Sequence, residues 1–580
     1  MAQDDIKGVQ SQLEGYIQHE IARYKVEGLS VALVDDQKIV WASGFGWADA
    51  AAKIPAGPDT RYRVGSISKL FTDTAAMQLV AEGRLDLDAP VQNTLPWFSI
   101  GSAWPNTKPI TLRQLMAHHS GLPRDVMRGM WLKEATSPEH DFRAMLRTLG
   151  QTQVDAPPER MFSYSNVGLD VVGAMVETAS GQPFEQRLQE SVLAPLDMKG
   201  AQFSATMPAD ATMAQAYFKG KAKSEQALRD IPAGGLTASV TDLARFLMMQ
   251  FSGGRNREGA VVLPAAQQAA MLQPQYPGLA LDADTRIGLG WMLSDFNANP
   301  VRGGGPVAWH SGATFYFRSQ MMMLPEQKLG VVVLSNDGAA GGVVDGVARR
   351  ALALLLEARK GIRQAPDPGF VPSVHAWTNA QWQSVQTACA GDYLTLMGGV
   401  ASLKPKGSRL SVRYGQRQFE VREGEAGRLG LRYRLLGLFP VKLGPLSEIG
   451  FECTQIDGRH VLLGVLGGER ILIGERLPKP SLPAEVARWT GRYRARLLEG
   501  EVPTIDPTIR VFQDDGRLWA ELRSQEVFGG QKVRVLLQPI SETALRGIGP
   551  LSDMGPVIEI EKGKTPRFRF SGWTFERVAQ

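Results

Sequence analysis

The sequence predicts an α+β protein in which a mixed helix-and-strand domain is followed by two antiparallel β-barrels. In the first part, apolar runs without helix breakers alternate with strand-like segments. Beyond a proline-containing linker, short alternating strands are separated by glycine-rich turns. This second pattern occurs twice at an offset of about one hundred residues, which is the size of one small barrel. We therefore expect domains at residues 1–362, 376–479 and 480–580, with the linker at 363–375.

Helices are expected at both ends of the first domain. Apolar residues at helical spacing predict the first helix, and they are Leu13, Tyr16, Ile17, Ile21 and Tyr24. Residues 352–359 end the last helix, which we expect to pack beside the first one. A short helix at residues 377–385 is expected to precede the first barrel.

Ser66 and Lys69 stand three positions apart in front of an apolar run, residues 70–80, that reads as a buried helix. On a helix the two side chains are neighbours, with Cβ atoms ~5–6 Å apart. Ser66 then lies at the helix N-terminus, where free N–H groups and the helix dipole stabilise an alkoxide or an oxyanion. Lys69 is placed to accept the proton of the serine. Because a chance Ser-x-x-Lys is common, other segments must supply the missing partners.

Tyr164 and Asn166 supply the second element, just before an apolar helix expected at residues 169–178. A tyrosine at the end of a loop can aim its phenol at Ser66, as a base together with Lys69 and later as the acid for the leaving group. The side-chain amide of Asn166 can hold the lysine or a substrate carbonyl.

The third element is the run His310-Ser311-Gly312, ahead of a hairpin expected at residues 315–334 with its turn at 325–327. These three residues are candidates for binding the substrate. Gly312 lets a substrate approach the backbone closely. The N–H of Ala313 is then the candidate second oxyanion donor beside that of Ser66.

In this order, the three elements resemble the serine β-lactamase and penicillin-binding-protein superfamily, whose motifs include Ser-x-x-Lys and Lys-Thr-Gly. The resemblance covers roughly residues 10–360, and further matching segments are 28–34, 38–46, 112–123, 234–236 and 288–291. It implies a serine β-lactamase-like α/β sandwich for the first domain. It also implies acyl transfer through Ser66, with Lys69 and Tyr164 sharing the base role and with no metal or organic cofactor.

Two departures from the family pattern bear on the substrate. His310 replaces the lysine of Lys-Thr-Gly, as in the branch that contains D-aminopeptidases and several esterases, and the tyrosine motif has the Tyr-x-Asn form of that branch and of class C β-lactamases. Because histidine is mostly neutral at pH 7, a permanent anchor for a substrate carboxylate is lost. This argues against efficient β-lactam turnover and against carboxypeptidase action. The second departure is the stretch 314–317, in which Tyr316 adds bulk near the pocket, as does Trp309. Both residues can line the substrate or belong to the core.

The two predicted barrels share turn sequences. Residues 390–393 recur as 490–493, and residues 444–450 recur as 549–555. A serine-hydrolase domain followed by two eight-stranded barrels resembles the D-aminopeptidases of the superfamily, in which a loop of the last barrel reaches the active site. Residues 547–556 are the candidate for that loop by position. Because their sequence is present in both copies, we interpret them as a structural turn.

The cysteines and the composition set further limits. Cys389 and Cys453 could pair in an exported protein, although two buried thiols fit the spacing equally well. The net charge of +5 is spread over 580 residues without a dense basic run, so nucleic-acid binding is not expected. No apolar run approaches the ~20 residues that span a bilayer. His118 and His119 are adjacent, and we expect them to be structural rather than metal ligands.

The N-terminal residues after Met1 resemble the mature end that remains after removal of a signal peptide. We therefore expect a periplasmic or secreted protein, with a native cytoplasmic start as the alternative. The expected partner is a small-molecule or short-peptide substrate. Barrel edge strands are candidate surfaces for a homo-oligomer.

Three functions fit these residues. The first is a peptidase or amidase for short or D-residue-containing peptides, which the barrels and the His-x-Gly form favour. The second is a carboxylesterase for small acyl esters, which could use the same residues. The third is a penicillin-binding or cell-wall-interacting module, and the complete set of Ser66, Lys69, Tyr164 and Asn166 argues against it.

Overall fold

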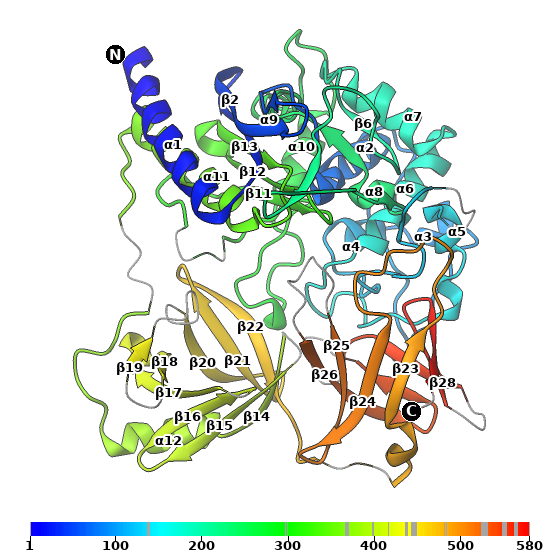
Figure 1. Cartoon of the computed structure of the whole chain (residues 1–580), viewed down its shortest axis with the longest axis vertical. Coiled ribbons are helices and arrows are strands. Elements are labelled where there is room, and N and C mark those ends of the chain that lie inside the picture. Colours follow the sequence, from blue (N-terminus) through cyan, green and yellow to red (C-terminus); the bar gives the residue numbers. More distant parts are fainter. Residues whose placement is uncertain are drawn as a thin grey trace.

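The computed structural model describes residues 2–580 except 136–139, 296, 298–299, 366–369, 397–398, 416, 436–438, 442–448, 481, 483, 524–531, 548–550, 552–553, 562–565 and 579–580. A mixed α+β domain lies above two barrels that stand side by side (Figure 1). The predicted fold class is confirmed. We call the mixed part the N-terminal domain.

The N-terminal domain is built on a six-stranded antiparallel sheet with the order β11-β12-β13-β1-β2-β3. At its centre, Val31 of β1 pairs with Val333 of β13 and with Ser43 of β2. Seven of the eight residues of β1 are buried, which explains why its sequence is apolar without alternation. The strands are β1 Gly28–Asp35, β2 Lys38–Asp49, β3 Ile54–Pro55, β11 Ala308–Ala313, β12 Arg318–Leu324 and β13 Leu329–Ser335.

Two helices, α1 Ala2–Tyr24 and α11 Gly341–Lys360, cover one face of this sheet. Leu13 of α1 and Leu352 of α11 are fully buried in the core between these helices and the strands. The expected pairing of the first and last helices is therefore confirmed (Figure 1).

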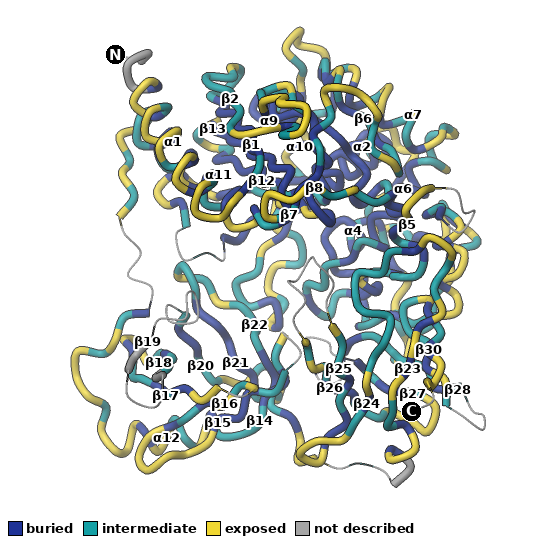
Figure 2. Tube along the Cα trace, in the orientation of Figure 1, coloured by how far each residue is buried: buried dark blue, intermediate teal, exposed yellow. Residues whose placement is uncertain are grey.

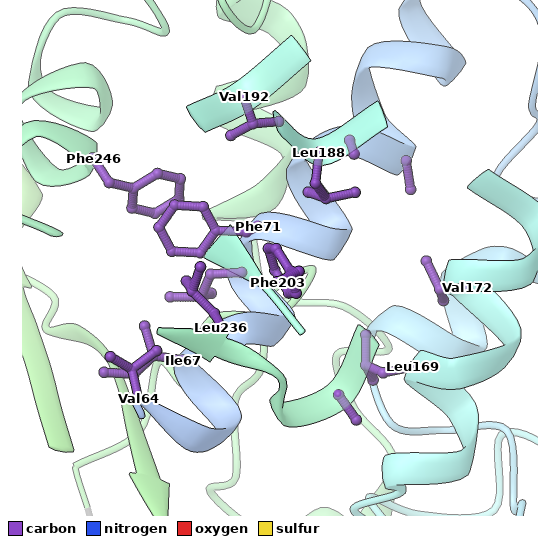
Figure 3. Close-up of a cluster of buried hydrophobic side chains, with 14 of the residues drawn as sticks. Val64, Ile67, Phe71, Leu169, Val172, Leu188, Val192, Phe203, Leu236 and Phe246 are labelled. Carbon is purple, nitrogen blue, oxygen red and sulfur yellow. The ribbon is translucent and has the colours of Figure 1, made fainter. Parts of the chain in front are cut away.

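A larger core lies on the opposite face of the sheet, around α2 Ser68–Ala81, α6 Asn166–Ser180 and α9 Val240–Phe251 (Figure 3). The ring of Phe71 from α2 contacts that of Phe246 from α9, with centroids 4.2 Å apart. Burying one such side chain stabilises the fold by about 1.5–3 kcal/mol. This packing fixes α2 in the domain, and with it the residues at the N-terminus of α2.

One boundary in this domain differs from the prediction. Residues 315–317 do not begin a strand: Thr314 N donates to Phe317 O at 3.1 Å, closing a turn, and β12 starts at Arg318. The remaining elements are β4 Tyr62–Arg63, η1 Gly65–Ile67, α3 Val91–Thr94, α4 Leu112–Met116, β5 Trp131–Leu132, α5 Phe142–Leu146, η2 Leu149–Gln151, α7 Phe184–Leu188, η3 Gln189–Leu193, β6 Gln202–Phe203, β7 Ala216–Phe218, β8 Lys221–Lys223, β9 Ala227–Leu228, α8 Ile231–Gly234, β10 Leu236–Ala238, α10 Ala265–Met271, η4 Ala280–Asp282 and η5 Pro325–Gln327.

The first barrel closes through a pairing between β17 and β18, and β19 extends β18 outside the ring. The disulfide Cys389–Cys453, with Cα atoms 5.4 Å apart, ties the preceding helix α12 Asn379–Cys389 to β20. The pairing that the sequence left open is therefore formed. The strands are β14 Gly391–Thr395, β15 Val400–Lys406, β16 Arg409–Tyr414, β17 Arg417–Glu423, β18 Leu429–Leu435, β19 Phe439–Val441, β20 Gly450–Ile456, β21 Arg459–Leu466 and β22 Glu469–Arg476, with the turn η6 Glu425–Gly427.

The second barrel, β23 to β30, is closed in chain order. The duplication is visible where each ring closes, because Tyr393 pairs with Arg476 in the first barrel and Tyr493 pairs with Arg577 in the second. The repeated turns at 444–450 and 549–555 fall largely outside the described residues. The elements are η8 Ala484–Trp489, β23 Gly491–Ala495, β24 Thr508–Asp514, β25 Arg517–Arg523, β26 Lys532–Ser541, β27 Ala544–Arg546, β28 Val557–Glu561, β29 Arg567–Phe570 and β30 Trp573–Arg577.

Burial is densest in the sheet and helices of the N-terminal domain, whereas the barrels alternate between buried and exposed positions (Figure 2). Over the described part of the chain, no helix combines the length and apolar character needed to cross a membrane.

Candidate active site

Ser66 and Lys69 meet where η1 passes into α2. The Nζ of Lys69 donates to Ser66 Oγ at 3.0 Å and to the backbone oxygen of Ala233, in α8, at 2.7 Å. Lys69 is 1% exposed, so its Nζ is buried in the domain and does not contact solvent. The N–O distance is within the reach required for proton transfer to or from the serine hydroxyl.

Two glycines allow β11 to lie directly against η1. A Cβ on Gly65, whose φ is +54°, would lie 2.6 Å from Ala313 N. A Cβ on Gly312 would lie 1.9 Å from Val64 O. Because neither position has space for a side chain, the N–H of Ala313 is brought beside the backbone of Ser66. These are the two predicted oxyanion donors.

Tyr164 lies over the lysine and between two histidines. The centre of its ring is 5.1 Å from Lys69 Nζ, 4.3 Å from the ring centre of His118 and 6.3 Å from that of His310. The next residue, Ser165, is the N-cap of α6, and its Oγ accepts from Gly168 N at 2.9 Å. The cap places Tyr164 just outside the helix and Asn166 at its first position.

Asn166 is held by a loop that the sequence did not point to. Its Nδ2 donates to Asp125 Oδ1 at 2.6 Å, and its backbone N donates to Arg124 O at 2.8 Å. The guanidinium of Arg124 lies 5.1 Å from the ring centre of Tyr164. Nothing in the sequence around these two residues distinguishes them, because they join the site only through tertiary contact.

His310 is buried, with 2% of its surface exposed. Burial, followed by the positive charge of Lys69, lowers the pKa of His310 to about 3. Its Nδ1 lies 2.7 Å from Ser311 O. The imidazole is therefore neutral near pH 7, as the sequence indicated, and it presents no fixed cation to a substrate carboxylate.

Buried carboxyl groups lie beneath the site. Burial raises the pKa of Asp170, one turn after Asn166, well above its usual value, and the charge of Asp230 raises it further. Burial also raises the pKa of Asp230, although its Oδ1 accepts from Arg229 Nε at 2.6 Å. Asp73, four residues after Lys69, has its pKa raised well above normal by burial, against the opposing effect of the lysine charge. For each of these acids, burial shifts the balance toward the neutral form, and for Asp230 the neighbouring Arg229 opposes this shift.

Other aromatic and histidine candidates divide between the site and the core. His119 Nε2 lies 2.8 Å from Asp282 Oδ2, a structural contact as expected. His118, in contrast, stacks on Tyr164 and accepts from Ser165 N at 3.2 Å, a site role that the sequence missed. Trp309 donates to Ser294 O at 2.8 Å and packs on the core under α1 and α11.

Tyr316 is 9% exposed, and its backbone N donates to Glu225 Oε2 at 3.0 Å. Its ring lies 5.9 Å from that of Phe315. These contacts place it in the turn that follows Ala313. A substrate-binding role for Tyr316 and for Ser311 stays a prediction.

A cavity of about 1210 Å³ adjoins Tyr164 where the three domains meet. Its walls include Arg124 and Asp125, Leu472 of the first barrel, and residues 554–556 of the second.

The described residues of the second-barrel loop 547–556 reach the N-terminal domain. Met554 is buried together with Ala156 and Met161 of that domain, and Gly555 N donates to Asp155 O at 2.7 Å. The described residues of this segment therefore pack against the N-terminal domain and line the cavity beside Tyr164, and a role in restricting substrates stays a prediction. Its sequence twin in the first barrel could not show this, because the neighbours of the two copies differ.

Known proteins share this architecture in part. The family model described as β-lactamase matches residues 13–355. Protein Flp of Staphylococcus aureus strain MW2 is 27% identical over 338 residues, covering 56% of this chain and 63% of Flp. This chain thus spans less than two thirds of the length of Flp. Penicillin-binding protein 4 of Amycolatopsis lactamdurans is 28% identical over 297 residues, covering 49% of this chain and 74% of that protein.

Solved structures show the same fold. The octameric penicillin-binding protein homologue from Pyrococcus abyssi has a TM-score of 0.52 at 24% identity, covering 80% of this chain and 99% of that one. SurE with D-Leu has a TM-score of 0.54 at 20% identity, covering 81% and 100%. EstCE1, a hydrolase with promiscuous acyltransferase activity, has a TM-score of 0.50 at 22% identity, covering 60% and 98%.

Proposed function

Because the chain belongs to the β-lactamase family, we propose that it is a serine hydrolase that forms an acyl-enzyme on Ser66 and acts on amide bonds of short or D-residue-containing peptides. The observation that carries the proposal is the 3.0 Å contact between Ser66 Oγ and the buried Nζ of Lys69, beside the N–H of Ala313. A nucleophile, a base within reach and an oxyanion site are the three parts that acyl transfer requires.

The proposed reaction has two halves. Ser66 Oγ attacks the substrate carbonyl carbon, and its proton passes to Lys69 and Tyr164, which act as one coupled group. The N–H groups of Ser66 and Ala313 hold the oxyanion. When the tetrahedral intermediate collapses, the amine leaves with that proton. Water then attacks the acyl carbon by the same route and releases the acid.

The neutral His310 supports a substrate without a free carboxylate next to the scissile bond, because the position at which the family has a lysine carries no fixed positive charge here. Its neutrality argues against efficient turnover of penicillins. The D-Leu in the SurE structure supports substrates with D-residues for this chain as well.

A carboxylesterase is the second candidate, and the fold shared with EstCE1 favours it. The discriminating experiment compares kcat/KM for D- and L-alanyl p-nitroanilides and a p-nitrophenyl acyl ester, with Ser66→Ala as control. Turnover of an anilide supports the amidase, and its D/L ratio defines the stereochemistry. Turnover of the ester alone supports the esterase. Anilide and ester activity retained in Ser66→Ala would remove both.

Export to an oxidising compartment is part of the proposal, and the Cys389–Cys453 disulfide supports it, since disulfides are rare in reducing compartments. A homo-oligomer is proposed as well, because the Pyrococcus abyssi homologue is octameric. Light scattering of the purified chain tests the oligomer. Thiol titration of the chain taken directly from cells tests the disulfide.

A further inference from the structure

The irregular segment at residues 124–130 connects the active site to the second barrel. It lies between the tight turn at Gly121 and β5, and it has no strand or helix of its own. Backbone N–H groups in such a segment need partners from elsewhere in the fold. Three consecutive ones, from Met127, Arg128 and Gly129, all donate to residues of the second barrel.

Ser571, in the turn between β29 and β30, supplies two of these partners. Met127 N donates to its Oγ at 2.8 Å, and Arg128 N donates to its backbone oxygen at 3.1 Å. The hydroxyl in turn donates to Asp125 O at 3.0 Å. A single side chain therefore bridges two backbone groups of the segment, one on each side of Val126.

Glu501 supplies the third partner. Its Oε1 accepts from Gly129 N at 2.9 Å and from Trp573 Nε1 at 2.9 Å. Its Oε2 accepts from Leu498 N at 2.7 Å, and the residue is 9% exposed. Hydrogen bonds to a charged acceptor are stronger than those between neutral groups, and burial strengthens them further.

The opposite side of the same segment holds the active site. Asp125 accepts from the Asn166 side chain, and Arg124 accepts from the Asn166 backbone. Arg229 fixes the next residues from within the N-terminal domain, with Nη2 donating to Val126 O at 2.7 Å. The segment is thus hydrogen-bonded to the second barrel on one side and to Asn166, the first residue of α6, on the other.

We propose that Ser571 and Glu501 are positioning residues for the hydrolase: they hold residues 125–129 from the barrel side, and through Asp125 they set the position of Asn166 and of its neighbour Tyr164. Neither residue touches the reacting atoms. The second barrel then contributes to the geometry of the active site. This inference rests on the proposed function.

The first test is Ser571→Gly in the full chain. Ser571 has φ +51°, a conformation that glycine adopts without strain, so the variant removes the hydroxyl bridge and keeps the turn. A misplacement of about 1 Å at a catalytic group costs on the order of 10²-fold in rate. We expect kcat for the reactive substrate of the wild type to fall about tenfold or more, with KM changed less than about threefold and with the fold intact at the assay temperature.

Asp515→Gly is the matched control. Asp515 has φ +49° and is followed by Gly516 in the turn between β24 and β25, the same arrangement as Ser571 and Gly572. Its side chain is 71% exposed, and its nearest ion pairs are 3.7 and 3.9 Å long. Exposed pairs of this kind contribute little. The control is expected to keep the wild-type kcat.

Glu501 gives an independent test through a conservative pair. Glu501→Gln keeps one oxygen for Gly129 N and Trp573 Nε1 and loses only the bond from Leu498 N, which lies within the second barrel, so it should keep kcat close to wild type. Glu501→Ala removes the bridge and should lower kcat as Ser571→Gly does. If Ser571→Gly does not fold, the contrast between Gln and Ala at position 501, measured on the folded fraction, decides the matter.

The outcomes separate the two hypotheses. Wild-type kcat in folded Ser571→Gly and in Glu501→Ala, while Ser66→Ala is inactive, would overturn the positioning role and leave the proposed function standing. A Ser66→Ala variant as active as the wild type would overturn the proposed function itself. Loss of kcat in Ser571→Gly but not in Asp515→Gly supports the positioning role.

Discussion

Gly312→Ala tests the oxyanion site most sharply among single substitutions. The added Cβ would lie 1.9 Å from Val64 O and 2.3 Å from Ser319 Oγ, which itself donates to Val64 O at 2.7 Å. To restore ordinary contact distances, β11 has to withdraw from η1 by about 1 Å or more. Ala313 follows directly in the chain, so its N–H moves away from Ser66.

Loss of one oxyanion donor lowers kcat by about 10²–10³-fold, equivalent to roughly 2.7–4 kcal/mol of transition-state stabilisation. Overpacking of the strand costs about 1–3 kcal/mol of stability. The assay is kcat and kcat/KM with a p-nitrophenyl ester, at a temperature where circular dichroism shows a folded protein. Gly342→Ala is the control, because a Cβ there meets nothing within 4 Å. A folded Gly312→Ala whose kcat stays within about threefold of the wild type would refute the assignment of Ala313.

Three further predictions concern the base, the domain contact and the first barrel. Lys69→Met should lower kcat by about 10²–10⁴-fold, as expected for loss of a general base. It should not lower the unfolding temperature, because an apolar side chain of similar length replaces a buried polar one. Turnover within tenfold of the wild type would count against Lys69. Burial raises the pKa of the Asp155 carboxyl to about 7, above its value in the unfolded chain. The folded state therefore binds this proton more tightly than the unfolded chain does. The stability that this protonation adds is lost as the pH rises through 7. Thermal unfolding at pH 5 and pH 8 should therefore show a loss on the order of 2 kcal/mol that is absent in Asp155→Asn; equal losses in both proteins would contradict this. Replacing Cys389 and Cys453 by serine removes the cross-link between residues 64 positions apart, so the unfolded chain gains conformational entropy. The free energy of unfolding of the first barrel, measured in urea, should fall by about 4 kcal/mol, with kcat unchanged. An unchanged free energy of unfolding would show that the disulfide is not formed.

Local patterns predicted the nucleophile and its helix. Ser66 and Lys69 are neighbours because they share one helical face, and the apolar run that follows must be buried. The barrels were predicted from period-two alternation and from the repeat around Tyr393 and Tyr493. Each of these features depends either on residues close together in the chain or on a sequence repeat. A single sequence is enough to detect either kind of pattern.

Contacts between distant segments could not be predicted in this way. The aromatic residues at 315–317 favour a strand by propensity. Packing overrides this preference. The ring centre of Phe315 lies 4.9 Å from that of Trp131, and the ring centre of Phe317 lies 6.4 Å from that of Tyr62. Asp125 is likewise ordinary in its own segment, and only the folded chain places it against Asn166.

The most direct test of Ser66 as the nucleophile is mass spectrometry of the chain during turnover of an activated acyl ester. We expect one added acyl group on the peptide that contains Ser66, formed at the rate of the first turnover and absent in Ser66→Ala. An acyl group on another residue, or ester turnover that persists in Ser66→Ala, would contradict the assignment of Ser66 as the nucleophile.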